Sequence, residues 1–374
     1  MAPRPPGSRL NPHQSTFLDF LRIAAASAVC FHHYSSLQPG VQAFPNVGQE
    51  AVIVFFVLSG FIIMLTTTEG RGSVGDYSIK RASRIYSTLV PCLLLEVAFC
   101  VAALTIDPSA VQSFPWLDDV SASNSLLAVT FINTTPLGDA AGFGGMPIWS
   151  LTWEVWYYVV FALVAVAQRR VLAGIVLLAV VLFLGLEPFL WMPSWIFGSL
   201  AATAFLRGRA GRGNARRRGT LFAAGGVLAL LVAWSSGLRS ALSVPASRLA
   251  GVGSEYLFPH SVGFLYFAIF GLAATAAIWG VLVLLDGRDG RPFEERTAAR
   301  IQRIADGTFV LYLNHTSLMV LLYVVFGGWS VPYLVPALTA GILLSWGHRI
   351  ERLRFPLRQR LMTFFGRRAP AAAP

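Results

Sequence analysis

Residues 17–34 read FLDFLRIAAASAVCFHHY, an apolar stretch of membrane-spanning length that contains an arginine and two histidines. Arg22 and His33 are eleven residues apart, which on an α-helix is three turns to within about 20°. The two side chains therefore share one face and lie roughly 16 Å apart along the axis. Ionisable groups are rare inside membrane helices and mark paired sites or reaction paths. The stretch predicts a membrane-spanning helix with a functional polar face.

The whole chain has the composition of a membrane protein. Its 374 residues are 55% hydrophobic and 13% charged, whereas about a quarter of the residues in a soluble domain are charged. Apolar runs of about 20 residues recur along the sequence and predict an all-α, polytopic transmembrane bundle of about ten spans. The apolar stretch 123–135 is too short to cross a membrane, and we expect it to form an interfacial or re-entrant piece. The expected spans are 16–36, 48–67, 86–106, 149–167, 171–187, 190–206, 220–237, 262–285, 305–326 and 330–348.

The basic residues indicate the orientation of these spans. With both termini in the cytoplasm, 26 of the 29 basic residues fall on the inner side, and only Arg239 and Arg248 fall outside. Short cytoplasmic loops are rich in arginine and lysine, so this split explains the net charge of +11 without nucleic-acid binding. We expect a multi-pass protein of the inner (plasma) membrane, anchored by its first helix. Its parts would be a cytoplasmic segment (1–15), a membrane domain (16–348) and a basic cytoplasmic tail (349–374).

Three ionisable residues are expected in one layer near the outer side. His33 lies toward the outer end of the first span, Glu50 begins the second, and Glu154 lies one turn into the fourth. A carboxylate close to an imidazole holds its tautomer and raises its basicity, which suits a general base. Ser150 and Thr152 could add hydrogen bonds in the same layer.

Cationic residues gather where the third expected span begins. Arg81 and Arg84 are three residues apart beside Lys80, so they would share a helix face and form a site for phosphates. The same residues could instead be ordinary positive-inside anchors. Asp19 and Arg22, also three residues apart, form either a structural ion pair or part of the polar face.

The sequence gives weaker support for a functional role of two further histidines. His32 projects about 100° away from His33 on the same helix, so it is expected to face packing or the interface. His315 lies in the middle of a span beside Asn314, where it is either part of a buried polar network or a catalytic partner.

The sequence lacks the motifs that mark several common classes of enzyme. The chain has no Gly-x-Ser-x-Gly elbow, no His-Glu-x-x-His, no Walker loop and no dinucleotide-binding glycine pattern. The three cysteines lie within apolar segments without metal-type spacing, and we interpret them as packing residues. No metal cofactor is expected.

Five separated blocks of sequence, taken in order, resemble the acyltransferase-3 family of bacterial integral membrane acyltransferases. The Arg-x₁₀-His pattern of the first span is one of them. The others are FFVLSGF in the second span, the Arg-x-x-Arg of KRASRIY, IWSLTWEVWYY with its glutamate, and DGTFVLYLNH with its tyrosine and histidine. The chain departs from the family pattern at Phe20, 49–51, Thr152 and Phe309, none of which removes the histidine, the arginine pair or Glu154.

The resemblance implies transfer of an acyl group, often acetyl, from cytoplasmic acyl-CoA to a hydroxyl on a sugar or related acceptor. Arg81 and Arg84 would hold the CoA phosphates, and the pantetheine arm would pass Arg22. His33 would activate the acceptor hydroxyl or carry the acyl group, and Glu154 would orient or polarise. The remaining candidates for substrate contact or support are Asp19, Glu50, Ser150, Tyr312 and His315. The expected partners are acyl-CoA, a carbohydrate-type acceptor and the lipid bilayer.

Two other classes of function stay open at this point. A transporter or flippase for a glycan or small molecule would also have about ten spans with charged residues inside the membrane. A catalytically inert sensor or scaffold is the third possibility.

Overall fold

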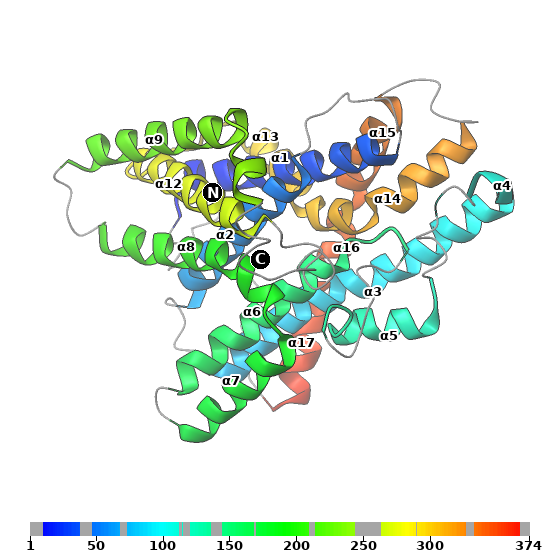
Figure 1. The fold of residues 1–374 in the computed structure, drawn as a ribbon, viewed down its shortest axis with the longest axis horizontal. Coiled ribbons are helices and arrows are strands. Elements are labelled where there is room, and N and C mark those ends of the chain that lie inside the picture. Colours follow the sequence, from blue (N-terminus) through cyan, green and yellow to red (C-terminus); the bar gives the residue numbers. More distant parts are fainter. Residues whose placement is uncertain are drawn as a thin grey trace. The chain divides into compact units, whose positions relative to one another are not determined.

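The computed structural model describes residues 10–37, 47–67, 73–111, 114, 120–135, 144–167, 170–208, 214–243, 263–288, 290–326 and 333–366. Every regular element within these ranges is a helix (Figure 1). The predictions for residues 1–9 and 367–374 lie outside the described residues. The helices are α1 (Pro12–Leu37), α2 (Gly48–Thr67), α3 (Val74–Ile106), α4 (Pro108–Val111), α5 (Ala122–Thr130), α6 (Ile148–Ala167), α7 (Val171–Leu184), α8 (Glu187–Gly208), α9 (Ala215–Ser235), α12 (Phe264–Leu284), α13 (Glu295–Asp306), α14 (Thr308–Val325), α15 (Leu334–Trp346), α16 (His348–Glu351) and α17 (Arg354–Phe364).

Each of the ten expected spans falls on one of these helices. Among the described residues, seven helices are long and apolar enough to cross a membrane, namely α2, α3, α6, α8, α9, α12 and α14. The other three expected spans fall on α1, with 26 residues, α7, with 14, and α15, with 13. A 14-residue helix is about 21 Å long, which is less than the roughly 30 Å of hydrocarbon it would have to cross. The all-helical membrane class is confirmed, and the count of ten stays a prediction.

The third expected span is longer than its sequence pattern indicated. α3 has 33 residues and begins at Val74, twelve residues before the expected start at 86. Its first turn is fixed by a capping box, in which Ser73 accepts from the backbone N–H of Asp76 and the Asp76 carboxylate accepts from that of Ser73. The expected start at 86 is where the apolar run begins, and the helix extends beyond that run at its N-terminal end. Arg81 and Arg84 lie inside this helix, where residues three apart share a face, as expected.

The piece at 123–135 forms only the nine-residue helix α5. A helix of that length extends about 13 Å, so it is too short to cross a bilayer, as expected. It ends at Phe131, which has φ of 56° in the left-handed region.

The chain divides into two compact units. Unit 1 comprises Met1–Leu21, Gln49–Arg71 and Leu184–Ala298, and unit 2 comprises Arg22–Gly48, Gly72–Phe183 and Ala299–Pro374. Each unit is therefore built from segments that are distant in the sequence.

Close backbone contact holds unit 1 together. A Cβ atom on Gly226 of α9 would lie 2.4 Å from the backbone nitrogen of Ala277 on α12, and one on Gly280 would lie 2.3 Å from that of Ala223. α2 and α8 meet in the same way, because a Cβ on Gly60 would lie 2.0 Å from the Trp195 carbonyl oxygen. Small residues of this kind let helices approach closely in lipid, where van der Waals packing replaces the hydrophobic effect.

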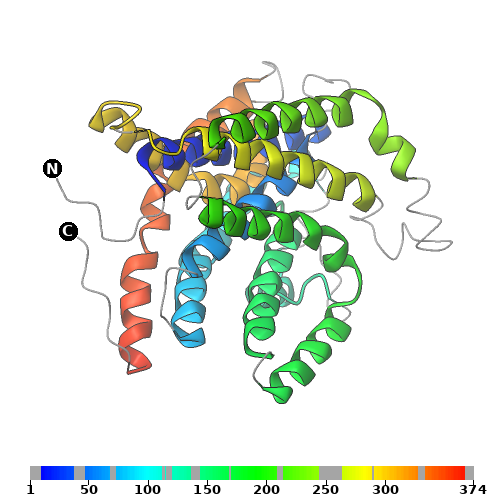
Figure 2. The same ribbon diagram turned by 90° about the vertical axis from the view of Figure 1, so that its left-hand side faces the viewer.

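Unit 2 is organised around α3. α14, α16 and α17 pack against it, and Figure 2 shows α17, in red, beside the first half of α3. Residues 349–374, expected as a tail, thus contribute the packed helix α17. An apolar core joins the second half of α3 to α14 and includes Phe114, which lies on neither helix. Its members are Cys100, Ala103, Phe114, Val320 and Val324.

Candidate functional site

Two histidines from distant parts of the sequence meet in unit 2. His33 lies on α1 and His315 on α14, and the Nε2 atom of His315 is 3.0 Å from Nδ1 of His33. Their ring centroids are 4.8 Å apart. His315 has no solvent exposure, whereas His33 is half-buried. Of the two roles that the sequence left open for His315, direct contact with His33 supports partnership.

The partners of the two rings indicate where the protons lie when both are neutral. Nδ1 of His315 is 2.9 Å from the carbonyl oxygen of Tyr312 and 3.1 Å from that of Leu311. A carbonyl oxygen only accepts, so this Nδ1 carries the proton and Nε2 is an acceptor. The Nδ1–H of His33 then donates to that Nε2, and the Val29 carbonyl, 3.0 Å away, is a second acceptor for it. Nε2 of His33 is consequently left with an unprotonated lone pair.

A series of polar side chains continues from this pair along α14 and α6. Tyr312 is one turn from His315, and its hydroxyl is hydrogen-bonded to the hydroxyl of Ser150 at the start of α6. One turn further along α6, the Glu154 carboxylate accepts a hydrogen bond from the hydroxyl of Tyr158. We refer to His33, His315, Tyr312, Ser150, Glu154, Tyr158 and Arg81 as the polar column.

Arg81 of α3 completes the polar column. Its guanidinium carbon lies 5.6 Å from the ring centroid of Tyr77 and 5.8 Å from that of Tyr158, which is within the range of cation–π attraction. The hydroxyl of Tyr77 donates to the backbone carbonyl of Tyr158 at 3.4 Å. The middle of α6 and the first third of α3 are thus side by side, and Glu154 is linked to Arg81 through one tyrosine.

The expected arginine pair has two different environments. Nε of Arg84 is 3.8 Å from the carboxylate of Glu351 on α16. That buried carboxylate also accepts from Thr88 at 2.8 Å and from Arg354 at 2.7 Å. Arg84 keeps 38% of its side chain exposed, and Lys80 is exposed. Two of the three expected cations are therefore accessible to a ligand.

α1 runs without interruption through Asp19, Arg22 and His33. The helical register on which the alignment of Arg22 with His33 depends is therefore present. Both Asp19 and Arg22 are half-buried on this helix.

Glu50 lies in unit 1, where it forms an ion pair with Arg239. The Nη1 atom of Arg239 is 3.2 Å from the Glu50 carboxylate, and the same guanidinium donates to the side-chain oxygen of Gln49. His33 lies in unit 2, so a common layer with Glu50 stays a prediction. Thr152, expected to supply a hydrogen bond, donates to the Asn133 side chain at 2.5 Å.

Glu96 is a buried polar residue that the sequence analysis missed. It lies in the second half of α3 and has no solvent exposure. Its carboxylate accepts hydrogen bonds from the backbone N–H of Gly145, the hydroxyl of Ser317 and the side-chain amide of Asn314. A single glutamate inside LLLEVAFC was itself a signal, because carboxylates are rare within membrane helices.

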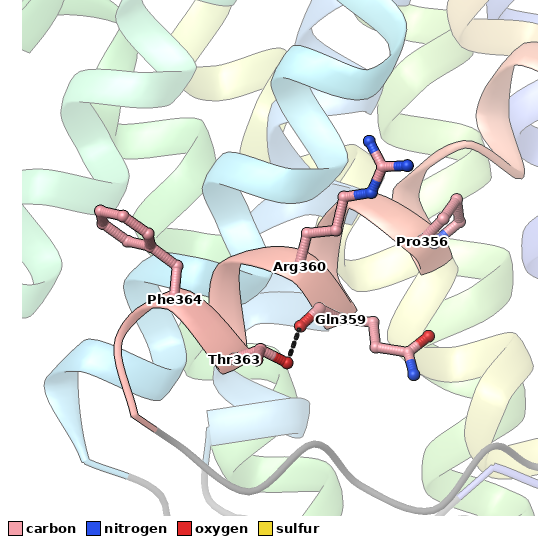
Figure 3. A pocket seen from close by; sticks show the side chains of 5 residues that line it. All are labelled: Pro356, Gln359, Arg360, Thr363 and Phe364. Carbon is pink, nitrogen blue, oxygen red and sulfur yellow. Dashed lines mark hydrogen bonds between the residues drawn. The ribbon is translucent and has the colours of Figure 1, made fainter.

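A surface hollow of about 500 Å³ lies on α17 (Figure 3). Its lining side chains all belong to α17, where the hydroxyl of Thr363 donates to the backbone carbonyl of Gln359 at 3.0 Å. None of them belongs to the polar column. The lining residues are Pro356, Gln359, Arg360, Thr363 and Phe364.

Comparison with known proteins places the chain in a family. The acyltransferase-3 model, described as an acyltransferase domain, matches residues 15–349. The chain belongs to this family, as its five sequence blocks predicted. It is also 29% identical over 192 residues to an O-acetyl transferase of Shigella phage Sf6, a match that covers 46% of this chain and 53% of the relative. The match thus spans about half the length of that relative. No solved structure matches the chain.

Proposed function

We propose that this protein is an integral membrane O-acyltransferase in which Nε2 of His33 is the reacting base. The observation that carries the proposal is the 3.0 Å contact between the two imidazoles, which leaves this one nitrogen unprotonated. Membership of the acyltransferase-3 family and the likeness to an O-acetyl transferase support the reaction class. The acyl group we expect is acetyl.

In the proposed step, Nε2 of His33 takes the proton of an acceptor hydroxyl while the hydroxyl oxygen attacks the thioester carbonyl. The carbon–sulfur bond then breaks, and the leaving thiolate takes the proton back from the imidazolium. His315 accepts from Nδ1–H of His33 throughout, which orients the ring and stabilises its charged form. In the alternative route the same lone pair attacks the thioester carbonyl, the carbon–sulfur bond breaks and CoA leaves as the thiolate, so that His33 carries the acyl group. The acceptor hydroxyl then takes the acyl group from His33, and its proton neutralises the thiolate.

We propose acyl-CoA as the donor, with its phosphates held by the cations of α3. Lys80 and Arg84 are accessible, and guanidinium groups suit bidentate contact with phosphate. Arg81 connects this region to Glu154 through Tyr158, so the polar column leads from the phosphate site to the histidine pair. Glu154 would orient the groups along that path.

The acceptor we propose is a hydroxyl of a glycan, a lipid-linked sugar or a glycosylated natural product. The distribution of basic residues supports a multi-pass protein of the inner membrane with both termini inside. The donor would then reach Arg84 from the cytoplasm, and the acceptor would approach His33 from the opposite side.

The test compares membranes that contain the parent protein, His33→Ala or His32→Phe, each given labelled acetyl-CoA and total cell glycans. We expect His33→Ala to lose transfer at least 100-fold, because general-base catalysis contributes about 10²–10⁴-fold. His32→Phe is the matched control, since it changes the neighbouring imidazole, whose ring is edge-on to His33 at 5.2 Å, and keeps an aromatic ring. Equal labelling by His33→Ala and the parent would refute the assignment. Movement of an acceptor across the membrane without change in mass would indicate a transporter instead.

A further inference from the structure

The carboxylate of Glu96 is surrounded by donors from two other segments of unit 2. Its Oε1 accepts from the backbone N–H of Gly145 at 2.7 Å, and its Oε2 accepts from the hydroxyl of Ser317 at 2.6 Å and the amide of Asn314 at 3.2 Å. The same Asn314 amide also donates to the carbonyl of Cys92 at 2.9 Å. A buried carboxylate is costly unless it is hydrogen-bonded, and here three donors converge on it.

The loop before α6 is shaped to reach this carboxylate. Gly144 has φ of +56°, and a Cβ atom there would lie 2.5 Å from Oε1 of Glu96. A Cβ on Gly145 would lie 2.7 Å from Cβ of Thr316. Both positions therefore need glycine, the first for its backbone conformation and its closeness to Glu96, the second for its closeness to α14.

The contacts of Glu96 lie on either side of His315 in the sequence. Asn314 immediately precedes this histidine, and Ser317 follows it by two residues. Successive side chains on a helix are turned by about 100°, so holding Asn314 toward α3 fixes the direction in which His315 projects. Gly145, the third partner, leads into α6, whose Ser150 is hydrogen-bonded to Tyr312.

We propose that Glu96 is a positioning residue for the histidine pair. It fixes the rotation of α14 and the start of α6, so that His315 meets Nδ1 of His33 and Tyr312 meets Ser150. The role rests on the proposed function, because it acts on the base assigned there. Glu96 acts through these neighbours.

The substitution Glu96→Gln tests this role with little change in volume. Glutamine keeps an oxygen for the N–H of Gly145, but its amide group then faces the amide of Asn314, so two donors oppose each other. We expect kcat for acetyl transfer to fall about 10- to 100-fold, since a displacement of about 1 Å can cost 10²-fold. KM for acetyl-CoA should stay within about twofold, because the phosphate-binding cations are unaffected. Adding Asn314→Asp supplies an acceptor for the new amide but removes the donor to the Cys92 carbonyl, so it should restore only part of kcat.

The matched control is Cys100→Ala, one turn further along α3 in the apolar core against α14. Thermal denaturation in detergent would be measured for every variant, and kcat would be scaled to folded protein. A positioning role predicts that Cys100→Ala keeps kcat at a comparable loss of stability. If Glu96→Gln yields no folded protein, Ser317→Ala, which removes a single donor, is compared with the control in the same way.

Two results would overturn the inference while leaving the proposed function in place. One is an active parent with unchanged kcat in folded Glu96→Gln, or in Ser317→Ala where that variant replaces it. The other is an equal loss of kcat in Cys100→Ala, which would show a merely structural role. A parent that transfers no acyl group to any acceptor would instead refute the proposed function, and the positioning role with it.

Discussion

At the scale of single residues, the site depends on which nitrogen of which histidine is free to react. The backbone carbonyls at Leu311 and Tyr312 fix the proton on Nδ1 of His315, and His315 in turn fixes the proton on Nδ1 of His33. Spacing along the sequence singled out His33 but could not choose between two roles for His315. Spacing also placed Glu154 in the layer of His33, which stays a prediction. The structure adds that Glu154 accepts a hydrogen bond from Tyr158, which lies beside Arg81.

Removing the acceptor on His315 tests this arrangement. We expect His315→Leu to lower kcat about 10- to 100-fold, less than His33→Ala does, because the Val29 carbonyl remains 3.0 Å from Nδ1 of His33 and still orients the ring. His315→Gln, whose side-chain oxygen can accept the same hydrogen bond, should retain more activity than the leucine variant. Steady-state acetyl transfer measures both. An activity of His315→Leu equal to that of the parent would contradict the role of His315 as the acceptor for Nδ1–H of His33.

At the scale of the elements, helix length and helix contact were predictable to different degrees. The apolar runs located the helices, but the run at 86–106 did not show how far α3 continues into the charged segment 74–85. The packed helix α17 was not predicted either, and its arginine-rich sequence was expected to be a tail. The reason is that charge patterns report a helix's exposed surface and not its packed surface. The close contacts of α9 with α12 depend on glycines whose neighbours only the folded chain reveals.

Two adjacent glycines of α9 allow a controlled test of that contact. A Cβ on Gly226 would lie 2.4 Å from the backbone of Ala277, whereas one on Gly225 meets nothing within 4 Å. We expect Gly226→Ala to destabilise the protein by about 1–3 kcal/mol through overpacking. Gly225→Ala should be neutral or stabilising by about 0.5–1 kcal/mol, since alanine favours a helix. Thermal denaturation in detergent measures both, and equal effects would contradict the close approach of the two helices.

At the scale of the whole molecule, the chain forms two compact units, each assembled from separated segments. The histidine pair and the rest of the polar column lie in unit 2. The ion pair between Glu50 and Arg239 lies in unit 1. The expected single membrane domain, 16–348, includes helices of both units.

The orientation of the molecule can be tested on either side of α9. In a variant without the native cysteines, we expect Ser240→Cys, just beyond the expected span 220–237, to react with an impermeant thiol reagent in intact cells. Arg217→Cys should react only after the membrane is opened, because its arginine-rich segment is predicted to be cytoplasmic. Both positions are exposed, and the cysteine-free parent measures background. The reversed pattern would refute cytoplasmic termini.

The helical membrane class, the positions of the apolar helices and the blocks that mark the family were all predictable from the sequence. These follow from local properties, namely run length, periodicity and charge, which each segment carries on its own. The packing of the helices, in contrast, brings His315 to His33 across 282 residues of sequence, places Arg84 beside Glu351, and lets Ser317 of α14 donate to Glu96. Helical periodicity fixes the face and depth of a side chain within one helix. The helix that it meets depends on how all the helices pack together.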